Sequence, residues 1–434
     1  MPKVTPQPVS VDIDFTDAQL TGQGGLTFLA QLARKSGLLD QFAQRICLKR
    51  GRRGASDAEM LWSLVASLAS GNGALSDLDA LRQDPVTAQL LGIDTVPSGR
   101  RLGEYLTRMG STQLDALQPI ARHLARHVAP TLLDHQVEAR GYVPVFVDGT
   151  AIEVDSRLFE GAGKGYDGSL QYWLHGVFVG GLWATGRLHP GGVDVAAGWC
   201  EQLEHDVAPL LNDRHPVWLH ADNAYYRGDL IRFCRERGWD YSISVTNDGY
   251  RRPILASREG LPESVWTDIG DGETATLTYH RTTDRDAGRQ SRPMSSSAAG
   301  RRAARRRYFR STPSFWSRED LPLAELVARH RGKQGQKNAF KGPLIDMDLH
   351  HPPCRCLRAN QAFYLCGQLA QMLLRGVQYH VLPQDARRHG LRPLIRYAIR
   401  AVARLVHTGR RWRLDFAKNA FRLDWLLHAS VQLE

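Results

Sequence analysis

Apolar residues recur at three- and four-residue spacing through residues 20–130, which predicts a helical N-terminal region. The segments AEMLWSLVASLAS (58–70) and TQLDALQPIARHLARHV (112–128) show this spacing most clearly. Between them, in residues 74–110, shorter apolar stretches are separated by Pro and Gly, which predicts several short helices. Such a cluster fits either a helix-turn-helix DNA reader or a plain helical bundle, and the pattern leaves both open.

From residue 142 the pattern changes to that of strands. The run YVPVFVDGTAIEVD (142–155) is rich in valine, as buried strands are, and two strand-like pieces follow at 173–181 and 182–192. A helix is predicted over 198–211, and residues 217–245 predict a strand, a turn, a helix and a strand. This order is that of a ribonuclease H-like mixed sheet, so the predicted fold class is α/β (mixed).

Residues 278–320 contain no Leu, Ile or Val, while Arg, Ser, Gly and Ala accumulate there. A segment of this composition cannot bury a core, and we expect it to be flexible. It fits a solvated linker, a basic arm that lies on DNA, or the remnant of a more strand-like sequence, because TATLTYH (274–280) just before it resembles a strand.

After residue 320 the spacing is helical again, with a buried amphipathic helix predicted over 361–382. In residues 390–409 arginines recur every four positions, which on one helix forms a positive stripe opposite an apolar face. Because such a stripe repels itself without acidic partners, we predict that it contacts a phosphate backbone. The four arginines are Arg392, Arg396, Arg400 and Arg404.

These changes divide the chain into four regions. We expect a helical N-terminal region that is a candidate for binding DNA, the first part of a ribonuclease H-like core, an insertion after the strands of 217–245, and a helical end of that core with basic C-terminal helices. The regions are 1–135, 136–250, 251–320 and 321–434.

Composition adds a basic charge, because Lys and Arg number 56 against 45 Asp and Glu. Arginine presents a planar fork to phosphate, so nucleic acid is the first candidate partner. No lysine-rich amphipathic helix, lipid signal or long apolar run predicts a membrane partner. The N-terminus lacks the apolar stretch of a signal peptide, and we therefore expect a cytoplasmic protein whose cysteines stay reduced.

Two aspartates stand where strands are predicted. Asp148 follows five mostly valine residues and precedes Gly149, and Asp222 ends the strand-like VWLHAD. Charged side chains are rarely buried in such places without a partner, and two aspartates on neighbouring strands could share a divalent cation. Oxygen ligands of this kind suit Mg²⁺ or Mn²⁺, and a pair of such ions about 3.5–4 Å apart supports phosphodiester cleavage.

At these residues the chain resembles a known family. FVDGTAIEVD around Asp148, HADNAYYRGD around Asp222, and the later ELVARHRGKQGQKNAFK and RANQAFYL resemble insertion-sequence DDE transposases of ribonuclease H-like fold, in the branch of the 1380-type elements. The resemblance implies metal binding by Asp148 and Asp222. It also implies recognition of terminal inverted repeats in double-stranded DNA, excision of the element, joining to target DNA, and a homo-oligomer that holds two ends.

The third carboxylate of that family, a glutamate directly before asparagine, is replaced by Lys337, which stands between Gln336 and Asn338. The nearest acids, Asp346 and Glu325, lie off the face of a helix running through GKQGQKNAFK. An ammonium group at this position removes a metal ligand and repels a dication. The sequence therefore predicts DNA binding with impaired or absent cleavage.

The same helix offers further candidates for binding DNA. His330 and Lys333 stand where the family has tyrosine and arginine, and Lys341 shares the face of Lys333 and Lys337. Two functions remain beside an active transposase: a non-catalytic relative that occupies element ends and represses an active copy, and a repair or processing nuclease on the same sheet. His350, His351, Cys354 and Cys356 are weaker zinc candidates, because no second pair follows at finger spacing.

Overall fold

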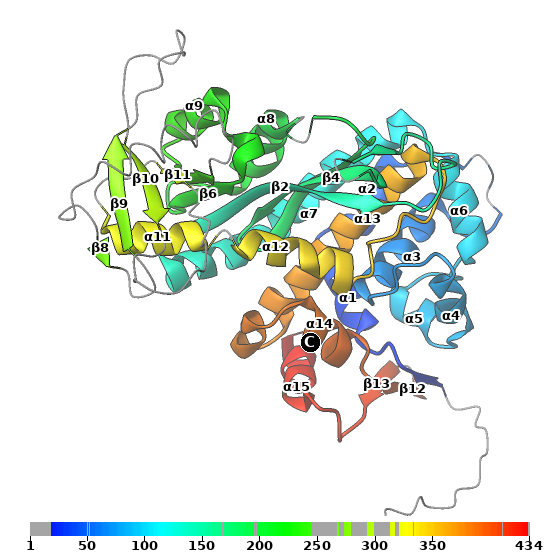
Figure 1. Cartoon of the computed structure of the whole chain (residues 1–434). Coiled ribbons are helices and arrows are strands. Elements are labelled where there is room, and N and C mark those ends of the chain that lie inside the picture. Colours follow the sequence, from blue (N-terminus) through cyan, green and yellow to red (C-terminus); the bar gives the residue numbers. More distant parts are fainter. Residues whose placement is uncertain are drawn as a thin grey trace, which may run out of the picture.

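The computed structural model describes residues 19–432 except for 50, 52, 166–167, 195, 197, 333 and 410; within 245–320 it describes four strands alone. Helices gather around a long mixed sheet, and a small C-terminal module stands apart at the bottom of the molecule (Figure 1).

Seven helices form the N-terminal part of the described chain. Within α3 every residue from Met60 to Ala69 is buried, so this helix has neighbours on all sides. A capping box begins it: Ser56 Oγ accepts from the Glu59 amide, and the Glu59 carboxylate accepts from the Ser56 amide. The helices are α1 (Leu26–Lys35), α2 (Leu38–Arg45), α3 (Asp57–Ala69), α4 (Asp77–Gln83), α5 (Thr87–Leu91), α6 (Gly99–Thr107) and α7 (Ser111–Arg140).

The central sheet has the strand order β5-β4-β2-β6-β7. Strand β4 is antiparallel to both of its neighbours, β5 and β2, while β2, β6 and β7 are parallel. This topology is the ribonuclease H-like mixed sheet, and the predicted fold class is confirmed. The strands are β2 (Val143–Glu153), β4 (Leu170–Val179), β5 (Leu182–His189), β6 (Val217–Ala221) and β7 (Asp240–Ser244), and the two-residue β3 (Gly163–Lys164) pairs with β4.

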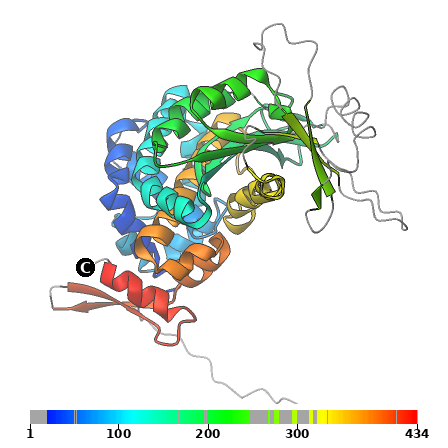
Figure 2. The same cartoon turned by 90° about the vertical axis from the view of Figure 1, so that its left-hand side faces the viewer.

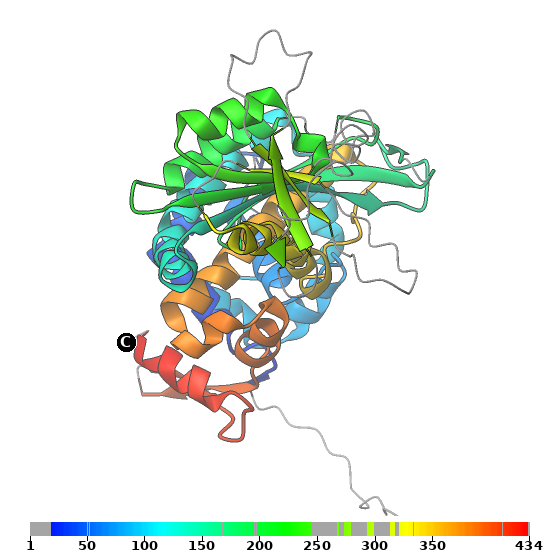
Figure 3. The ribbon, with the colours of Figure 1, turned by 60° about the vertical axis from the view of Figure 1, so that its left-hand side comes forward.

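Helices cover both faces of this sheet. The segment from α8 (Trp199–Gln202) through η1 (Leu203–Val207) and η2 (Ala208–Leu210), together with α9 (Gly228–Glu236), lies on one face. Helices α11 (Leu323–Arg331) and α12 (Gln334–Lys341) lie on the other, as the green and yellow helices above and below the sheet show (Figures 2 and 3).

Four more strands extend the sheet beyond β7, in the order β11-β10-β9-β8. Two of them lie within 278–320, the segment whose composition predicts flexibility, so parts of that segment are paired into the sheet. The edge of β7 supplies backbone donors and acceptors to β11, and ladder pairing does not require aliphatic side chains. The strands are β8 (Thr267–Asp268), β9 (Glu273–Thr278), β10 (Pro293–Ala298) and β11 (Pro313–Trp316), and the rest of 278–320 lies outside the described residues.

The C-terminal part begins with α11 and α12 and continues through the long buried α13, as predicted for 361–382. Helix α13 packs against α3, α7 and β5, so one hydrophobic core joins the N-terminal helices to the sheet. After α12 the elements are η5 (Gly342–Asp346), α13 (Leu357–Gly376), η6 (Val377–Val381), η7 (Gln384–Arg388), α14 (Leu391–Leu394), η8 (Ile395–Ile399), β12 (Ala403–Thr408), β13 (Arg411–Phe416) and α15 (Leu423–Gln432).

The predicted helix over 390–409 is wrong in its second half. Helical structure ends at Ile399, and the chain turns into β12, which pairs with β1 (Leu20–Thr21) and with β13. The amides of Gly24 and Gly25 donate to the carbonyls of Ala401 and Ile399 and fix the turn. Arg404 therefore lies on a strand and does not continue the stripe of Arg392, Arg396 and Arg400. None of the described helices is long and apolar enough to cross a bilayer.

Candidate catalytic site

Asp148 and Asp222 lie side by side on neighbouring parallel strands. Val147 of β2 pairs with Ala221 of β6, and each aspartate is the residue that follows. Asp148 lies within β2, Asp222 directly follows β6, and both are half-buried. Because parallel strands run in register toward the same edge, this pairing brings the two carboxylates to one place, as the sequence predicts.

The phenol of Tyr225 is near enough to both carboxylates for their charges to affect it. Its side chain is buried, and burial, followed by the charges of Asp148 and Asp222, raises the pKa of its phenol. Both carboxylates thus act on a single hydroxyl group. Asp222 is held in place by its own turn, because its Oδ1 accepts a 2.9 Å hydrogen bond from the Ala224 amide.

Helix α12 covers the face of the sheet to which Asp148 belongs. Phe146 and Asp148 are two positions apart on β2 and therefore share a face. A Cβ added to Gly335 would lie 3.0 Å from the Phe146 ring, so the start of α12 crosses this face. The Phe340 ring packs 4.9 Å from Phe178 between centroids.

Lys337 lies on this same helix, three residues before Phe340 and hence on nearly the same side. A Cβ on Gly176, the direct β4 partner of Asp148, would lie 3.0 Å from the Phe340 ring. The backbone of position 337 is thus carried over the strands that hold the aspartates. The Lys337 side chain lies outside the described residues, so its direction stays a prediction.

Acids near Lys337 in sequence are engaged elsewhere. Glu325 accepts from Arg329 at 2.6 Å, one turn along α11, and Asp346 pairs with Arg392 at 3.2 Å. In the part of the chain that the structure describes, no group of three or more His, Cys, Asp or Glu side chains is placed to hold a metal ion. Among the candidate zinc ligands, the ring centroids of His350 and His351 are 4.0 Å apart, and His350 Nδ1 lies 3.1 Å from the Leu344 carbonyl and 3.2 Å from Asp348 Oδ1. Cys354 is partly buried.

Of the remaining candidates on these helices, His330 is the best defined. Its Nδ1 is hydrogen-bonded to Ser242 Oγ, which fastens α11 to β7. Lys341 is exposed at the end of α12, and Lys333 lies outside the described residues.

Two residues beneath the aspartates were not found from the sequence. His175, on β4 opposite Gly149, is fully buried, its Nδ1 lies 2.6 Å from Gln202 Oε1, and its ring centroid is 5.8 Å from that of Tyr225. Burial lowers the pKa of His175 to about 4. The one sequence signal was the position of Tyr225 itself, three residues after Asp222 in DNAYYRGD.

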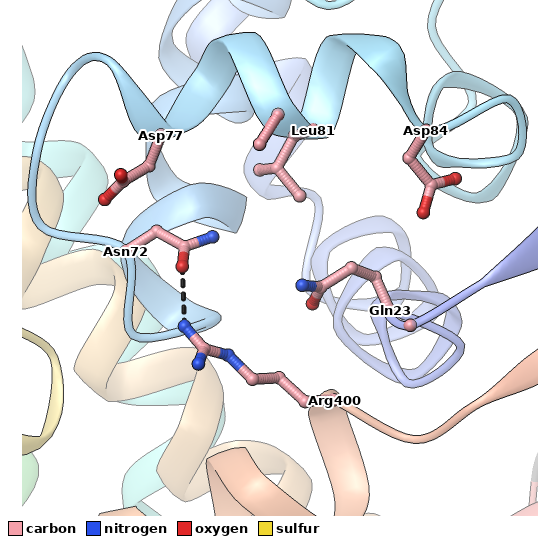
Figure 4. A pocket seen from close by; sticks show the side chains of 8 residues that line it. Gln23, Asn72, Asp77, Leu81, Asp84 and Arg400 are labelled. Carbon is pink, nitrogen blue, oxygen red and sulfur yellow. Dashed lines mark hydrogen bonds between the residues drawn. The ribbon is translucent and has the colours of Figure 1, made fainter.

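The arginines of the predicted stripe have three different surroundings, although all are exposed. Arg392 is paired with Asp346. Arg400 donates to the Ser70 carbonyl at 2.7 Å and to Asn72 Oδ1 at 2.6 Å, and so ties the C-terminal segment to the loop after α3 (Figure 4). The Arg396 guanidinium lies 5.4 Å from the Tyr397 ring centroid. A hollow of about 300 Å³ is lined by Gly71, Ile345, Asp346, Arg392, Ile395, Arg396 and Arg400.

Comparison with known proteins defines the class. Residues 5–434 match the family described as transposase DDE domain group 1, and the chain belongs to this family. None of the curated proteins matches it. Among solved structures, it is similar to a piggyBac transposase synaptic complex with hairpin DNA, with 8% sequence identity, a TM-score of 0.42, and coverage of 87% of this chain and 80% of that one.

Proposed function

We propose that the chain is the DNA transposase of an insertion sequence of the 1380-type branch, which binds terminal inverted repeats and is built for metal-dependent DNA cleavage and strand transfer. The observation that carries this proposal is the register of β2 and β6, which places Asp148 and Asp222 together beneath α12 in a transposase-family chain.

The two aspartates fit a hard divalent cation. They are oxygen donors from rigid neighbouring strands, and Asp222 keeps one oxygen for its own turn. Asp148 and Asp222 would hold Mg²⁺ or Mn²⁺, and the bound ion would supply charge stabilisation to the attacking and leaving oxygens of a phosphodiester. Tyr225 keeps its proton at neutral pH, because its pKa is raised, and so adds no negative charge beside the carboxylates.

Lys337 limits this chemistry in the present chain. Its ammonium group takes the place of the third carboxylate and, in the absence of metal, pairs with Asp148 or Asp222. This arrangement weakens metal binding and leaves a protein that holds DNA and cleaves it poorly. The position of Lys337 on α12, three residues before Phe340, supports this role.

The DNA contacts proposed for the chain come from basic groups around this face. His330 and Lys341 belong to the two helices over the sheet, and Lys333 stands between them in the sequence. Arg392, Arg396 and Arg400 line the hollow beyond η5, where Arg396 is the one we expect to contact phosphate, because Arg392 pairs with Asp346 and Arg400 is held by the loop after α3. Element ends and target DNA are the partners, and a homo-oligomer holds two ends in the prokaryotic cytoplasm. A second function, repression of an active relative by a copy that occupies its ends, is favoured by Lys337 alone.

Changing Lys337→Glu tests both the site and its defect. A supercoiled plasmid that carries the DNA flanking this gene is incubated with each protein, with and without Mg²⁺. The unmodified protein is expected to bind the plasmid and leave it intact, whereas Lys337→Glu nicks it at the element ends because the third ligand is restored. Mn²⁺ affinity, measured by calorimetry, is expected to rise about tenfold or more in the same variant.

Two controls separate the outcomes. Adding Asp222→Ala to Lys337→Glu should abolish both nicking and the gain in Mn²⁺ affinity. Strong cleavage by the unmodified protein would show that another carboxylate completes the site. Absence of DNA binding by every form would refute the transposase proposal itself.

A further inference from the structure

The β12–β13 hairpin stands out from the body of the molecule. It forms a small sheet with β1, which among the described residues pairs with the start of β12, at Ala403 and Arg404, and the Gln19 carbonyl accepts from the Leu405 amide. Beyond that point the two strands continue as a two-stranded ribbon to a turn at Gly409, whose φ is 61°. The ribbon lies at the bottom of the molecule, on the side of the sheet that carries α12 (Figure 2).

The two faces of the hairpin differ in chemistry. Near its base, Leu405 and Phe416 face the molecule, and the Phe416 ring stacks 5.8 Å from Phe28. Further out on this face are His407 and Trp412, which pair across the strands with ring centroids 4.6 Å apart. Trp412 is 55% exposed, so the hairpin carries a large aromatic side chain beyond the core that its base buries.

The opposite face carries arginine. Arg404, Arg411 and Arg413 alternate with the apolar positions and are all exposed. Arg413 is paired with Asp415 at 2.7 Å, whereas within the described part of the chain Arg404 and Arg411 have no ion pair. Arg404 lies directly across from Asp415, while Arg411 lies across from Thr408, so this exposed face carries three arginines against one aspartate.

Building on the proposed function, we infer that the β12–β13 hairpin enters the major groove of duplex DNA. The major groove, about 12 Å wide, admits a two-stranded ribbon, while the minor groove of about 6 Å is too narrow for two strands with their side chains. The hairpin enters turn first, so that its two faces meet the two walls of the groove: Arg404 and Arg411 contact the phosphates that border one wall, and His407 and Trp412, on the other face, reach base edges and methyl groups.

The position of the hairpin supports this partner. Arg396 is exposed on η8, the helical turn that leads into β12, and this segment lies on the same side of the sheet as α12 (Figure 3). A duplex that contacts Arg396 would therefore lie close to the hairpin, because β12 begins four residues after η8. Charge complementarity favours DNA over a second copy of this chain, because the chain itself carries a net charge of +11.

The test uses the full-length protein and a fluorescein-labelled 40-base-pair duplex of mixed sequence in KCl without Mg²⁺. Removing two phosphate contacts in Arg404→Ala/Arg411→Ala should reduce the slope of log affinity against log salt by roughly 0.9 for each contact. Arg404→Lys/Arg411→Lys should keep the slope of the unmodified protein. The matched control, Arg232→Ala/Arg235→Ala, removes two exposed arginines from α9 on the opposite face of the sheet and should leave the slope unchanged.

In a second duplex the cytosines carry glucosylated hydroxymethyl groups, and these groups fill the major groove. It should bind the unmodified protein several-fold more weakly than the plain duplex, and Trp412→Ala should lose much of that discrimination.

An unchanged salt slope in Arg404→Ala/Arg411→Ala, or equal binding of both duplexes by the unmodified protein, would overturn the inference while the transposase proposal stands. A changed oligomeric state by light scattering, with DNA binding unaltered, would instead assign the hairpin to contacts between copies. Failure of the unmodified protein to bind any duplex would remove the proposed function and the inference with it.

Discussion

His175 shows how strongly a single position beneath the site depends on its surroundings. The imidazole is fully buried, Nδ1 lies 2.6 Å from Gln202 Oε1, and Nε2 has no hydrogen-bond partner among the described residues. An imidazolium ion in this place would lose its hydration without a counter-charge, which is why burial lowers the pKa of His175 to about 4. The folded state therefore holds the neutral form.

This depressed pKa predicts a loss of stability in acid. In the unfolded chain His175 takes up a proton near pH 6.5, whereas in the folded chain it does so only near pH 4. The stability that depends on neutral His175 is therefore complete above pH 6.5 and is lost as the pH falls toward 4. Between pH 7.5 and 4.5 the free energy of unfolding should fall by about 2–3 kcal/mol more in the unmodified protein than in His175→Gln. Urea unfolding of both proteins at the two pH values measures the difference, and parallel pH profiles would contradict it.

Among the site residues, the sequence predicts those whose chemistry is visible in the chain. Asp148 and Asp222 stand out because a carboxylate in a valine-rich strand needs a partner. His175 and Tyr225 could not be found in this way, since their burial depends on residues brought from other elements. Gly149 is similar: a Cβ there would lie 2.3 Å from Trp173 Nε1, so the glycine beside Asp148 is required by a cross-strand ring.

At the scale of elements, the strands with β-branched runs and the long amphipathic helices were predictable. The strands β2, β4, β5, β6 and β7 and the helix α13 follow the expected segments. Strands β10 and β12 were missed for different reasons. The sequence of β10 contains no Leu, Ile or Val, and this strand is defined by its neighbours. Strand β12 shares a helix-like pattern with the segment before it and is selected by pairing with β1, far away in the sequence.

The broken stripe predicts that Arg396 and Arg400 have separate roles. Arg400 donates to the carbonyls of Ser70 and Gly71 and to Asn72, so Arg400→Ala should lower the free energy of unfolding by about 1–3 kcal/mol. Arg396→Ala should change stability by less than about 0.5 kcal/mol and reduce the salt slope of DNA binding by roughly 0.9. Urea unfolding and fluorescence anisotropy with a labelled duplex measure the two effects. The opposite assignment, with Arg396 stabilising the fold and Arg400 setting the salt slope, would refute this division.

At the scale of the whole molecule, side chains from three of the four regions expected from the sequence, those before 250 and after 321, meet in one core. A single hydrophobic cluster contains side chains from α1 to α15, including strands of the central sheet. Helix α13 is the link, because its buried glutamines bind the backbone of β5 while its other sides pack on α3 and α7. Regions that differ in sequence pattern thus depend on one another for burial, and the sheet positions its aspartates against helices from both ends of the chain.

If α13 joins these regions, a local change in it should destabilise all of them equally. Gln371 is buried, accepts from the Trp183 amide at 3.0 Å and donates to the Gly181 carbonyl at 2.9 Å. Gln371→Leu removes both bonds and leaves the buried backbone amide of Trp183 without this partner. The free energy of unfolding should fall by about 2–4 kcal/mol. Hydrogen exchange followed by mass spectrometry should show the same loss of protection in peptides from α3 and from β4, because both exchange through one global opening.

The control is Gln432→Leu, at an exposed position on α15, which should alter the protection of neither peptide. Loss of protection in β4 with α3 unchanged would mean that the N-terminal helices and the sheet unfold independently, and that α13 lies between two separate cores.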